Sequence, residues 1–311
     1  MPPSIILCQP YVGLHAQALG LAERAGLRPE LRDIAVRARW RWVPSRLWPA
    51  PLRAVGLDAS KDVPPDAVVF NAGGTTGVVG AALHRRGRRV VQIQHPRMDP
   101  RRFDLVVVNR HDGLSGPNVI VTRTALHRVT PERLAEAGAV WAPRLAHLPR
   151  PLVAVLVGGT NGRYRLDGPA ARALGAGLAG MMRDDRVGLA FTPSRRTAPE
   201  AVAALREAVE PPGGWVWDGE GENPYFGLLA LADAIVVTQD SVSMVSEAAA
   251  TRAPVLVAEL PGHSRRIGLF NEMMRRDGRT RTFQGRFEAW PVEPMDDTGA
   301  AAAEVRRRLG F

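Results

Sequence analysis

Short apolar runs alternate with amphipathic segments along the whole chain. The runs are rich in Val, Ile and Leu and end at Gly, Pro or polar residues, which is the pattern of buried strands. The segments between them repeat apolar residues at the spacing of one helix face. Short buried strands separated by helices indicate parallel sheets that are covered on both faces. The predicted fold is therefore α/β and doubly wound.

This pattern predicts elements through most of the chain. Strands are expected at Ser4–Leu7, Ala67–Asn71, Arg89–Ile93, Leu105–Val108, Val119–Val121, Leu152–Val157, Val187–Phe191, Ile235–Val237 and Val255–Val257. Helices are expected at His15–Ala25, Pro131–Ala137, Pro169–Met182, Pro199–Val209, Ser241–Ala250 and Arg266–Arg276.

The chain length and one proline-bearing link predict two domains. A chain of 311 residues suits two domains of about 150 residues each. Near the midpoint, Ala146-His147-Leu148-Pro149-Arg150-Pro151 is polar, and each proline pushes the residue before it towards an extended conformation. We therefore expect an N-terminal domain over residues 1–148, a C-terminal domain over residues 151–295 and a terminal helix within residues 296–311.

A glycine-rich loop follows the strand at Leu152–Val157. In open α/β sheets a ligand binds outside the carboxyl ends of the strands, where this loop lies. Glycines let the backbone approach a phosphate, threonine and asparagine side chains donate hydrogen bonds, and arginine adds charge. The candidate donor-binding residues here are Gly158, Gly159, Thr160, Asn161 and Arg163. An ordinary strand-to-helix turn is the simpler alternative.

A second polar loop follows the strand at Ile235–Val237 and begins a helix. Either Asp240 or Ser241 is a suitable N-cap. The helix start would offer N–H and hydroxyl donors to an anion, and Glu247 in the second turn can accept both hydroxyl protons of a ribose. The candidate residues are Asp240, Ser241, Ser243, Met244 and Glu247. The alternative is a capped helix with a solvated glutamate.

A third loop follows the strand at Val187–Phe191. Arg195 and Arg196 could meet phosphate and Ser194 a base edge, although pairing of either arginine on the surface is an equal alternative. The three loops follow strands of one predicted sheet, and carboxyl ends of parallel strands lie at one sheet edge. We therefore expect the loops to converge on a single nucleoside diphosphate.

The N-terminal half has strand-end loops of its own. His15 lies where a helix begins after the first strand, and an imidazole there could act as a general base at neutral pH. A capping or packing histidine is the simpler interpretation. Asp112, after a later strand, is the alternative base. The acceptor-side candidates are Gln17, Gly73, Gly74 and His95.

The formal charge of +10 does not predict a nucleic-acid-binding protein. Its arginines are spread through every segment and form no single stripe. Attraction to an anionic membrane surface fits this distribution better. Trp40, Trp42 and Trp48 lie in a proline-rich stretch, where packing beneath a loop is favoured over a membrane-facing or acceptor-facing patch.

Several classes of protein and of chemistry lose support. No apolar run reaches the roughly 18 residues of a membrane span and the N-terminus lacks the features of a secretory signal, so we expect a cytoplasmic protein, in peripheral contact with the inner membrane face. The single cysteine, Cys8, excludes an intramolecular disulfide and a multi-cysteine zinc site. There is no D-x-D pair, P-loop, H-E-x-x-H or G-x-S-x-G motif, so we expect no metal and no cofactor. Gly175–Gly180 matches G-x-G-x-x-G but lies inside a helical pattern, which indicates close helix packing.

Several sequence runs together resemble one family. The runs are Gly13–Glu23, Arg101–Val107, His111–Leu114, Gly116–Val119, Arg163–Leu166, Thr192–Thr197, Trp217–Gly219, Asn223–Tyr225 and Thr238–Ala248. Over almost the whole chain they resemble the elongated-mitochondria (mitochondrial fission) family, whose bacterial members are regarded as GT-B glycosyltransferases. The resemblance implies two Rossmann-like domains that face a cleft.

A more distant resemblance concerns the nucleotide end of the chain. Gly158–Gly162 and Glu247-Ala248 are similar to segments of the peptidoglycan N-acetylglucosaminyltransferase of lipid II synthesis. This implies that Glu247 holds the ribose, that His15 lies beside the acceptor and that the helix at Asp297–Leu309 packs back on the N-terminal domain. Asn161 stands where that transferase has glutamine, so the donor is not identified.

Together these features predict a metal-independent glycosyltransferase. It would move a sugar from a nucleotide diphosphate donor to a lipid or glycan acceptor, and backbone amides and arginines would stabilise the departing diphosphate. Two alternatives stay open. Eukaryotic relatives are linked to recruitment of the division machinery at mitochondria, which favours a non-enzymatic adaptor. The other alternative is a nucleotide-sugar epimerase of the same fold.

Overall fold

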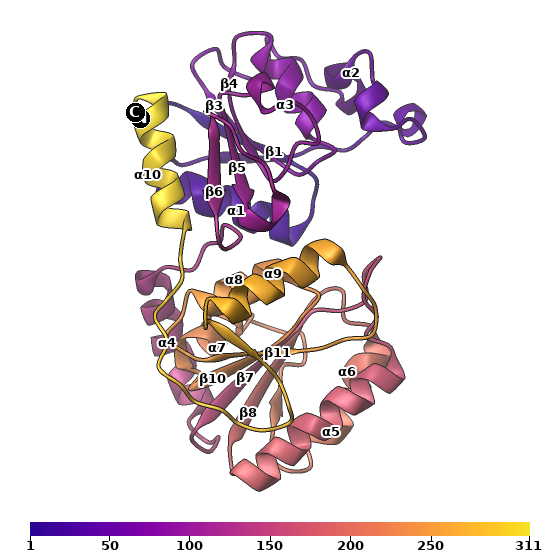
Figure 1. Ribbon diagram of the computed structural model, residues 1–311, viewed down its shortest axis with the longest axis vertical. Helices are drawn as coiled ribbons and strands as arrows, with labels where there is room; N and C mark the ends of the chain where they lie inside the picture. The colour runs from indigo at the N-terminus through magenta and orange to yellow at the C-terminus, as the bar shows by residue number, and fades with distance from the viewer. The chain divides into compact units, whose positions relative to one another are not determined.

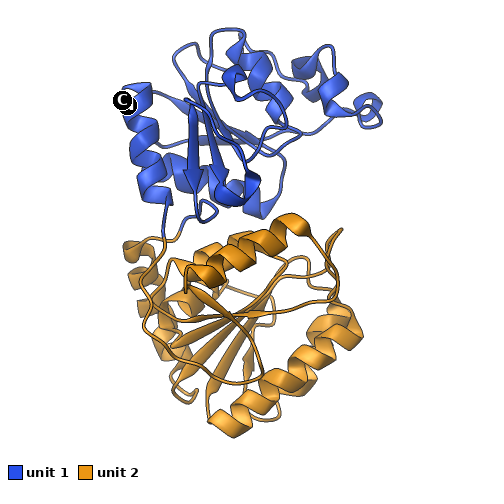
Figure 2. Cartoon of the chain, viewed as in Figure 1, with its two compact units in different colours: residues 1–128, 296–311 blue, residues 129–295 orange.

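The computed structural model describes residues 1–311, which divide into two compact units (Figure 2). Unit 1 comprises residues 1–128 and 296–311, and unit 2 comprises residues 129–295. Each unit holds one six-stranded sheet, and every neighbouring pair of strands is parallel. Helices lie on both faces of each sheet (Figure 1), so the predicted doubly wound α/β fold is confirmed.

The sheet of unit 1 has the strand order β2-β1-β3-β4-β5-β6. Its strands are β1 (Ser4–Cys8), β2 (Glu30–Asp33), β3 (Val68–Ala72), β4 (Arg89–Ile93), β5 (Leu105–Asn109) and β6 (Val119–Thr122). Its helices are α1 (Val12–Arg24), α2 (Pro51–Val55), α3 (Gly77–His84) and α10 (Thr298–Leu309), with short 3₁₀ turns η1 (Ala38–Trp40), η2 (Ser45–Leu47), η3 (Pro100–Arg102) and η4 (Arg110–Asp112).

The sheet of unit 2 has the strand order β12-β11-β10-β7-β8-β9. Its strands are β7 (Leu152–Val157), β8 (Gly188–Pro193), β9 (Trp215–Val216), β10 (Ala234–Thr238), β11 (Val255–Ala258) and β12 (Thr280–Thr282). Its helices are α4 (Pro131–Leu145), α5 (Gly168–Asp185), α6 (Pro199–Val209), α7 (Tyr225–Leu231), α8 (Val242–Ala249) and α9 (Arg265–Arg276).

Alternate residues of the inner strands enter two separate cores. In β1, Ile6 and Cys8 pack with α1 on one face of the sheet. Ile5 and Leu7 pack with α3 on the other face. Because successive side chains of a strand point to opposite faces, a strand that is buried on both sides is apolar at every position. This is why apolar runs in the sequence predict the inner strands correctly.

Three of the four edge strands escape prediction for the same reason, while the fourth, β6, matches the strand expected at Val119–Val121. β2 reads Glu-Leu-Arg-Asp and is mostly exposed, while β9 and β12 contain only two and three residues. A strand at the edge of a sheet has one strand neighbour and needs little burial, so its residues need not be apolar. The sequence pattern therefore misses three strands, one of which contributes to the candidate site.

The boundary between the units differs from the expected one. α4 precedes the link at Ala146–Pro151 but belongs to unit 2, where it packs against α7. Gly227 of α7 lies so close to Trp141 of α4 that a Cβ there would be 2.4 Å from the indole ring. The chain therefore passes into unit 2 after Arg128. At the other end, α10 belongs to unit 1 and packs on α1.

The glycine motif inside α5 has the structural role that its context predicts. Gly175 faces α6, and a Cβ on Gly175 would lie only 2.7 Å from the Cβ of Ala208. Close packing of two helices is thus confirmed, and the run is no dinucleotide fingerprint. None of the helices combines the length and the apolar composition that crossing a lipid bilayer requires.

Gly20 of α1 generates a stability prediction. A Cβ on Gly20 would lie 2.2 Å from the carbonyl oxygen of His127, so the Gly20→Ala variant must shift α1 or the segment against it. We expect a loss of about 1–3 kcal/mol in the free energy of unfolding, measured by urea denaturation. Gly268→Ala is the matched control, because Gly268 lies in α9 with nothing within 4 Å of its Cβ position. That variant should gain about 0.5–1 kcal/mol. Equal urea midpoints for the two variants would contradict the close contact between Gly20 and His127.

Candidate functional site

The strand-end loops of unit 2 lie in direct contact with one another. β7 and β10 are neighbouring parallel strands, so the loops that follow them begin at the same sheet edge. The amide of Gly158 donates to Thr238 Oγ1 at 2.8 Å, and the amide of Gly159 donates to Asp240 Oδ2 at 3.3 Å. A Cβ on Gly158 would lie 2.3 Å from Asp240 Oδ1, so this approach requires glycine.

The loop after β8 joins the same cluster. Ser194 Oγ donates to the carbonyl oxygen of Gly158 at 2.6 Å. Arg196 Nη2 lies 2.9 Å from Asp240 Oδ2. A Cβ on Gly159 would be 2.1 Å from the carbonyl oxygen of Arg196, which explains the second glycine of the motif. Three loops from three strands are thus fastened together around the Asp240 carboxylate.

The charge of Asp240 is balanced inside this cluster. Its side chain is fully buried, whereas that of Arg196 is 43% exposed. A buried carboxylate is stable only when it is paired and hydrogen-bonded, and Thr238 Oγ1 adds a bond at 2.7 Å. Arg196 is therefore committed to Asp240. Arg163 and Arg195 are exposed and form no ion pair, so they are the cations of these loops that remain for a ligand.

Thr160 and Asn161 order the glycine-rich loop from within. Thr160 Oγ1 accepts from the amide of Leu166 at 3.0 Å. Asn161 Oδ1 accepts from the amides of Arg163 at 2.8 Å and Tyr164 at 2.9 Å. The sequence predicts that both side chains face a phosphate, whereas the structure shows their oxygens holding the turn. Short polar side chains near loop amides often satisfy those amides in this way.

The amides available to an anion differ from those that the glycine motif predicts. Those of Gly158 and Gly159 are already donated within the protein. Thr160 and Gly162 of the loop are exposed, and their amides donate to no protein group. An anion at this loop would therefore meet Thr160 and Gly162, beside the guanidinium of Arg163.

α8 begins directly after the cluster and is anchored at both ends. Ser241 Oγ accepts from the amide of Met244 at 3.3 Å, which confirms the predicted N-cap. At the other end, the buried Arg279 donates to the carbonyl oxygens of Ala248 at 3.2 Å and Ala249 at 2.9 Å. A cation there also complements the helix dipole. The sequence does not single out Arg279, because one arginine among so many carries no positional signal.

Glu247 is buried in the second turn of α8, with 7% of its surface exposed. The hydroxyl of Tyr225, at the start of α7, donates to Glu247 Oε2 at 2.5 Å. No protein hydrogen bond engages Oε1. Burial raises the pKa of Glu247 to about 7, and the hydrogen bond from Tyr225 opposes this only in part. Glu247 is therefore not a solvated surface group, while Ser243 and Met244 are half-buried in the first turn.

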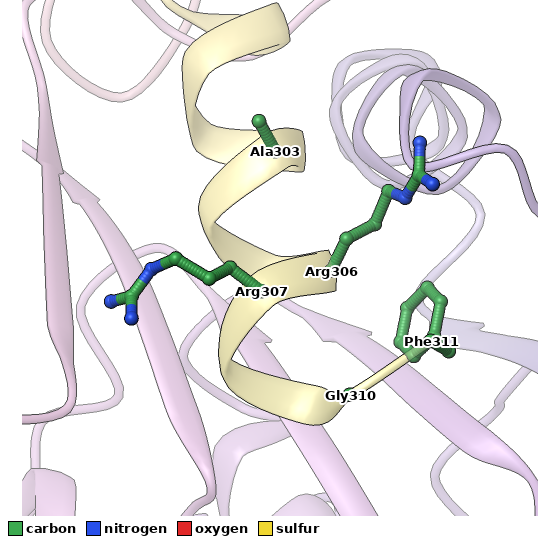
Figure 3. A pocket seen from close by; sticks show the side chains of 5 residues that line it. All are labelled: Ala303, Arg306, Arg307, Gly310 and Phe311. Carbon is green, nitrogen blue, oxygen red and sulfur yellow. The ribbon is translucent and has the colours of Figure 1, made fainter.

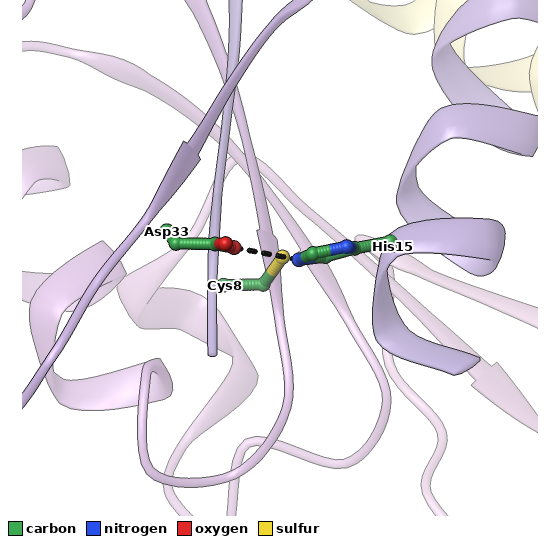
Figure 4. A group of neighbouring side chains, drawn as sticks. All are labelled: Cys8, His15 and Asp33. Carbon is green, nitrogen blue, oxygen red and sulfur yellow. Dashed lines mark hydrogen bonds and ion pairs between the residues drawn. The ribbon is translucent and has the colours of Figure 1, made fainter. Parts of the chain in front are cut away.

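In unit 1 the side chains of Cys8, His15 and Asp33 lie together (Figure 4). Cys8 ends β1 and Asp33 ends β2, and the two residues are partners in the parallel pairing of these strands. His15 projects from the first turn of α1, and its Nε2 lies 2.6 Å from Asp33 Oδ1. If Nε2–H donates to the carboxylate, Nδ1 carries the lone pair that a general base needs. Asp33 escapes sequence analysis because its strand is polar.

These three side chains bring their ligand atoms within 4.8 Å of one another, a spacing that a metal ion could use. Burial, together with Asp33, raises the pKa of the Cys8 thiol to about 12. Metals bind the thiolate, and this environment disfavours it. His15 Nε2 is already bonded to Asp33. The geometry therefore fits an oriented histidine better than a metal centre.

The predicted acceptor-side residues lie at the carboxyl edge of the same sheet. Gln94 Nε2 donates to Oε1 of the buried Gln17 at 3.3 Å. Gly73 follows β3 with φ of 100°, Gly74 comes next, and His95 follows β4, where its Nδ1 accepts from an amide at 2.9 Å. Gln94 has φ of 69°, a conformation that residues other than glycine rarely adopt. Such strain is common at functional sites.

Asp112, the alternative base of the sequence analysis, is placed apart from His15. Its Oδ2 accepts from the amide of Asn109 at 3.2 Å, which caps its own turn, and its side chain is 2% exposed. Three strand steps separate β1 from β5, or about 14 Å at the usual strand spacing. The structure thus gives Asp112 a local capping contact and brings His15 together with Asp33 instead.

A separate hollow of about 490 Å³ is lined by Ala303, Arg306, Arg307, Gly310 and Phe311 (Figure 3). α10 begins near Arg123, just after β6, and Arg308 contacts the carbonyl of Pro117, just before β6. The end of α10 therefore lies at the amino edge of the sheet. The candidate residues lie at the carboxyl edge, so the hollow takes no part in their site.

Comparison with known proteins identifies the family that this chain matches. A family model described as Mitochondrial fission ELM1 matches residues 12–309. The mitochondrial fission protein ELM1 of Arabidopsis thaliana is 32% identical over 274 residues, which cover 78% of this chain and 64% of that protein. The chain therefore spans less than two thirds of the length of this relative.

Solved structures with a similar fold include nucleotide-sugar enzymes. UDP-GlcNAc 2-epimerase of Methanocaldococcus jannaschii has a TM-score of 0.60 at 12% identity, and the match covers 100% of both chains. UGT71G1 of Medicago truncatula, complexed with UDP-glucose, has a TM-score of 0.55 at 11% identity, covering 99% of this chain and 89% of that one. At such low identity the likeness shows the fold alone, which is the two-unit α/β architecture of the GT-B type.

The raised pKa of Glu247 generates a prediction about stability and pH. A carboxyl whose pKa is about 7 when folded and 4.5 when unfolded holds its proton more tightly in the folded protein. The stabilisation that this tighter proton binding adds to the free energy of unfolding is therefore fully present below pH 4.5 and is lost as the pH rises through 7. Glu247→Gln keeps an acceptor for Tyr225 and removes the titration. From about pH 5 to about pH 8, the variant should gain roughly 2–3 kcal/mol relative to wild type.

Urea unfolding at both pH values measures this change. Glu207→Gln is the matched control, because Glu207 is exposed on α6. The difference in unfolding free energy between this variant and wild type should not depend on pH. A difference between Glu247→Gln and wild type that stays constant with pH contradicts a buried, proton-binding Glu247.

Proposed function

The chain belongs to the mitochondrial fission ELM1 family, and we propose that it is a metal-independent glycosyltransferase that uses a nucleotide diphosphate sugar as donor. The observation that carries the proposal is the junction of three strand-end loops around Asp240, with the buried carboxylate of Glu247 on the helix that follows. In open α/β sheets this edge is where nucleotides bind.

The proposed donor site extends from Glu247 to the glycine-rich loop after β7. Glu247 Oε1 accepts from the ribose hydroxyls, while Oε2 stays bonded to Tyr225. Glu247 comes six positions after the N-cap Ser241, or about 9 Å along the helix, which is the scale of a nucleoside diphosphate. The diphosphate then lies at the start of α8, where the helix dipole favours an anion.

Cations and amides stabilise the leaving group in this proposal. Arg163 and Arg195 are exposed at the loops, and the amides of Thr160 and Gly162 are open. Preorganised donors of this kind stabilise charge that develops in a transition state, which a divalent ion does in other transferases. The similar folds of a UDP-GlcNAc 2-epimerase and of UGT71G1 in complex with UDP-glucose support a nucleotide sugar as the donor class.

Unit 1 supplies the proposed base. Nδ1 of His15 takes the proton of an acceptor hydroxyl, the acceptor oxygen bonds to the anomeric carbon, and the bond from that carbon to the diphosphate breaks with its electron pair leaving on the nucleotide. Asp33 orients the imidazole and stabilises its charged form. The acceptor class is a lipid or glycan that bears such a hydroxyl.

Nucleotide binding tests the donor site. Thermal unfolding with UDP, GDP, CDP and ADP in turn should show stabilisation by one of them, worth about 2.7 kcal/mol at 100 times the dissociation constant. Glu247→Ala should weaken that affinity about tenfold or more, because a charged hydrogen bond is lost. Glu207→Ala is the control and should bind as wild type does. Stabilisation by none of the four supports the adaptor alternative and contradicts the proposal.

Turnover tests the pair of His15 and Asp33. The donor in this assay is a sugar linked to the nucleotide that stabilises the protein in the binding experiment. With an acceptor present, His15→Gln should slow the release of nucleoside diphosphate that accompanies sugar transfer by about a hundredfold or more, without weakening nucleotide binding. Asp33→Asn should lower the rate less and shift its pH profile, since Asp33 acts through His15. The double variant should be little slower than His15→Gln alone. Additive losses contradict the pairing, and an altered sugar formed without acceptor indicates an epimerase.

A further inference from the structure

The segment between β2 and α2, residues 37–48, protrudes beside α2 at the outer end of unit 1 (Figure 1). It contains the two 3₁₀ turns η1 and η2 and three tryptophans. These tryptophans do not share one environment. Two of them hold the segment together, and the third points away from the protein.

Trp40 and Trp48 form the inner support of this segment. Trp48 is 7% exposed, and its Nε1 donates to the carbonyl oxygen of Val43 at 2.9 Å. The rings of Trp40 and Trp48 meet edge to face, with their centroids 6.3 Å apart. Aromatic pairs in this arrangement are favourable beyond the area that they bury. The segment thus has a defined shape, and the predicted packing beneath a loop holds for these two residues.

Trp42 and Leu47 have no such support. Trp42 is 92% exposed and Leu47 is 62% exposed. A tryptophan that is held out in water by a folded turn keeps a large apolar surface unburied, and such a surface commonly marks a contact with a partner or membrane. Tryptophan is also the side chain that favours the boundary between lipid headgroups and acyl chains.

The charges around Trp42 select the partner. Arg39, Arg41 and Arg46 are exposed and form no ion pair. No acidic residue occurs between Asp33 and Asp58, so the segment attracts anions without compensation. Arginines beside an exposed tryptophan and leucine match an anionic bilayer, in which phosphates lie above an apolar layer.

We propose that residues 37–48 form a docking surface for an anionic lipid bilayer. Trp42 and Leu47 enter the boundary between headgroups and acyl chains, and Arg39, Arg41 and Arg46 pair with the lipid phosphates. Neither step depends on the proposed catalytic activity. The contact is peripheral, because the segment is too short to do more than reach the interface.

Co-sedimentation of the full chain with vesicles tests this surface. Binding is measured with phosphatidylcholine alone and with a phosphatidylcholine–phosphatidylserine mixture. We expect binding to the mixture that weakens as salt is added. The variant W42A/L47A should lower the apparent affinity about tenfold or more, from lost apolar burial. The variant R39Q/R41Q/R46Q should lower it about a hundredfold.

Matched variants at other positions show whether the loss of binding is specific to residues 37–48 or follows from removing any exposed apolar or cationic side chains. V140A/L269A removes two other exposed apolar side chains, and R85Q/R183Q/R252Q removes three other exposed arginines. Both should bind as wild type does, and W42A/L47A should keep the wild-type midpoint of unfolding. Vesicle binding that is absent, or unchanged in W42A/L47A, overturns the proposal. So does self-association that depends on Trp42 in the absence of lipid, because the surface then serves a second copy of the chain.

Discussion

The buried carboxylate of Asp240 is the interaction on which the loop cluster of unit 2 depends. One of its oxygens accepts the amide of Gly159 and meets the guanidinium of Arg196, and the other accepts the hydroxyl of Thr238. These partners come from the loop after β7, the loop after β8 and the last residue of β10. Each loop alone would be free to move on the protein surface, whereas one desolvated charge that needs all of its partners fixes them together. The close approach it requires leaves room only for glycine at positions 158 and 159.

Asp240 and Glu247 are both buried, yet their surroundings give them opposite properties. Asp240 has a cation and several donors, so its charge is satisfied by the protein itself. Glu247 has only the neutral hydroxyl of Tyr225, and burial raises its pKa to about 7. An acid buried without a counter-charge costs stability near neutral pH, a cost that proteins accept mainly where a ligand uses the group. The first carboxylate therefore holds the loops together, and the second is the one available to the donor in the proposed function.

β2 connects two features of unit 1 that look unrelated in the sequence. Its last residue, Asp33, reaches His15 across the end of β1, because β1 and β2 pair in parallel register. The chain then leaves the sheet edge and forms the segment that exposes Trp42. An edge strand has one side free of strand neighbours, so the chain beyond it can extend outwards without disturbing the core. The oriented histidine and the exposed basic surface thus share one structural origin.

Local chemistry is what the sequence by itself determined. Apolar runs mark the inner strands because both faces are buried, Ser241 caps α8 because its hydroxyl reaches an amide three residues on, and a glycine-rich turn marks a strand end. The tertiary structure decided which groups meet. It engaged the side-chain oxygens of Thr160 and Asn161 with amides of their own loop, committed Arg196 to Asp240, bonded the buried Glu247 to Tyr225 and paired His15 with Asp33. Periodicity and capping depend on neighbours along the chain, whereas these contacts depend on the order of strands in a sheet, and segments distant in sequence set that order.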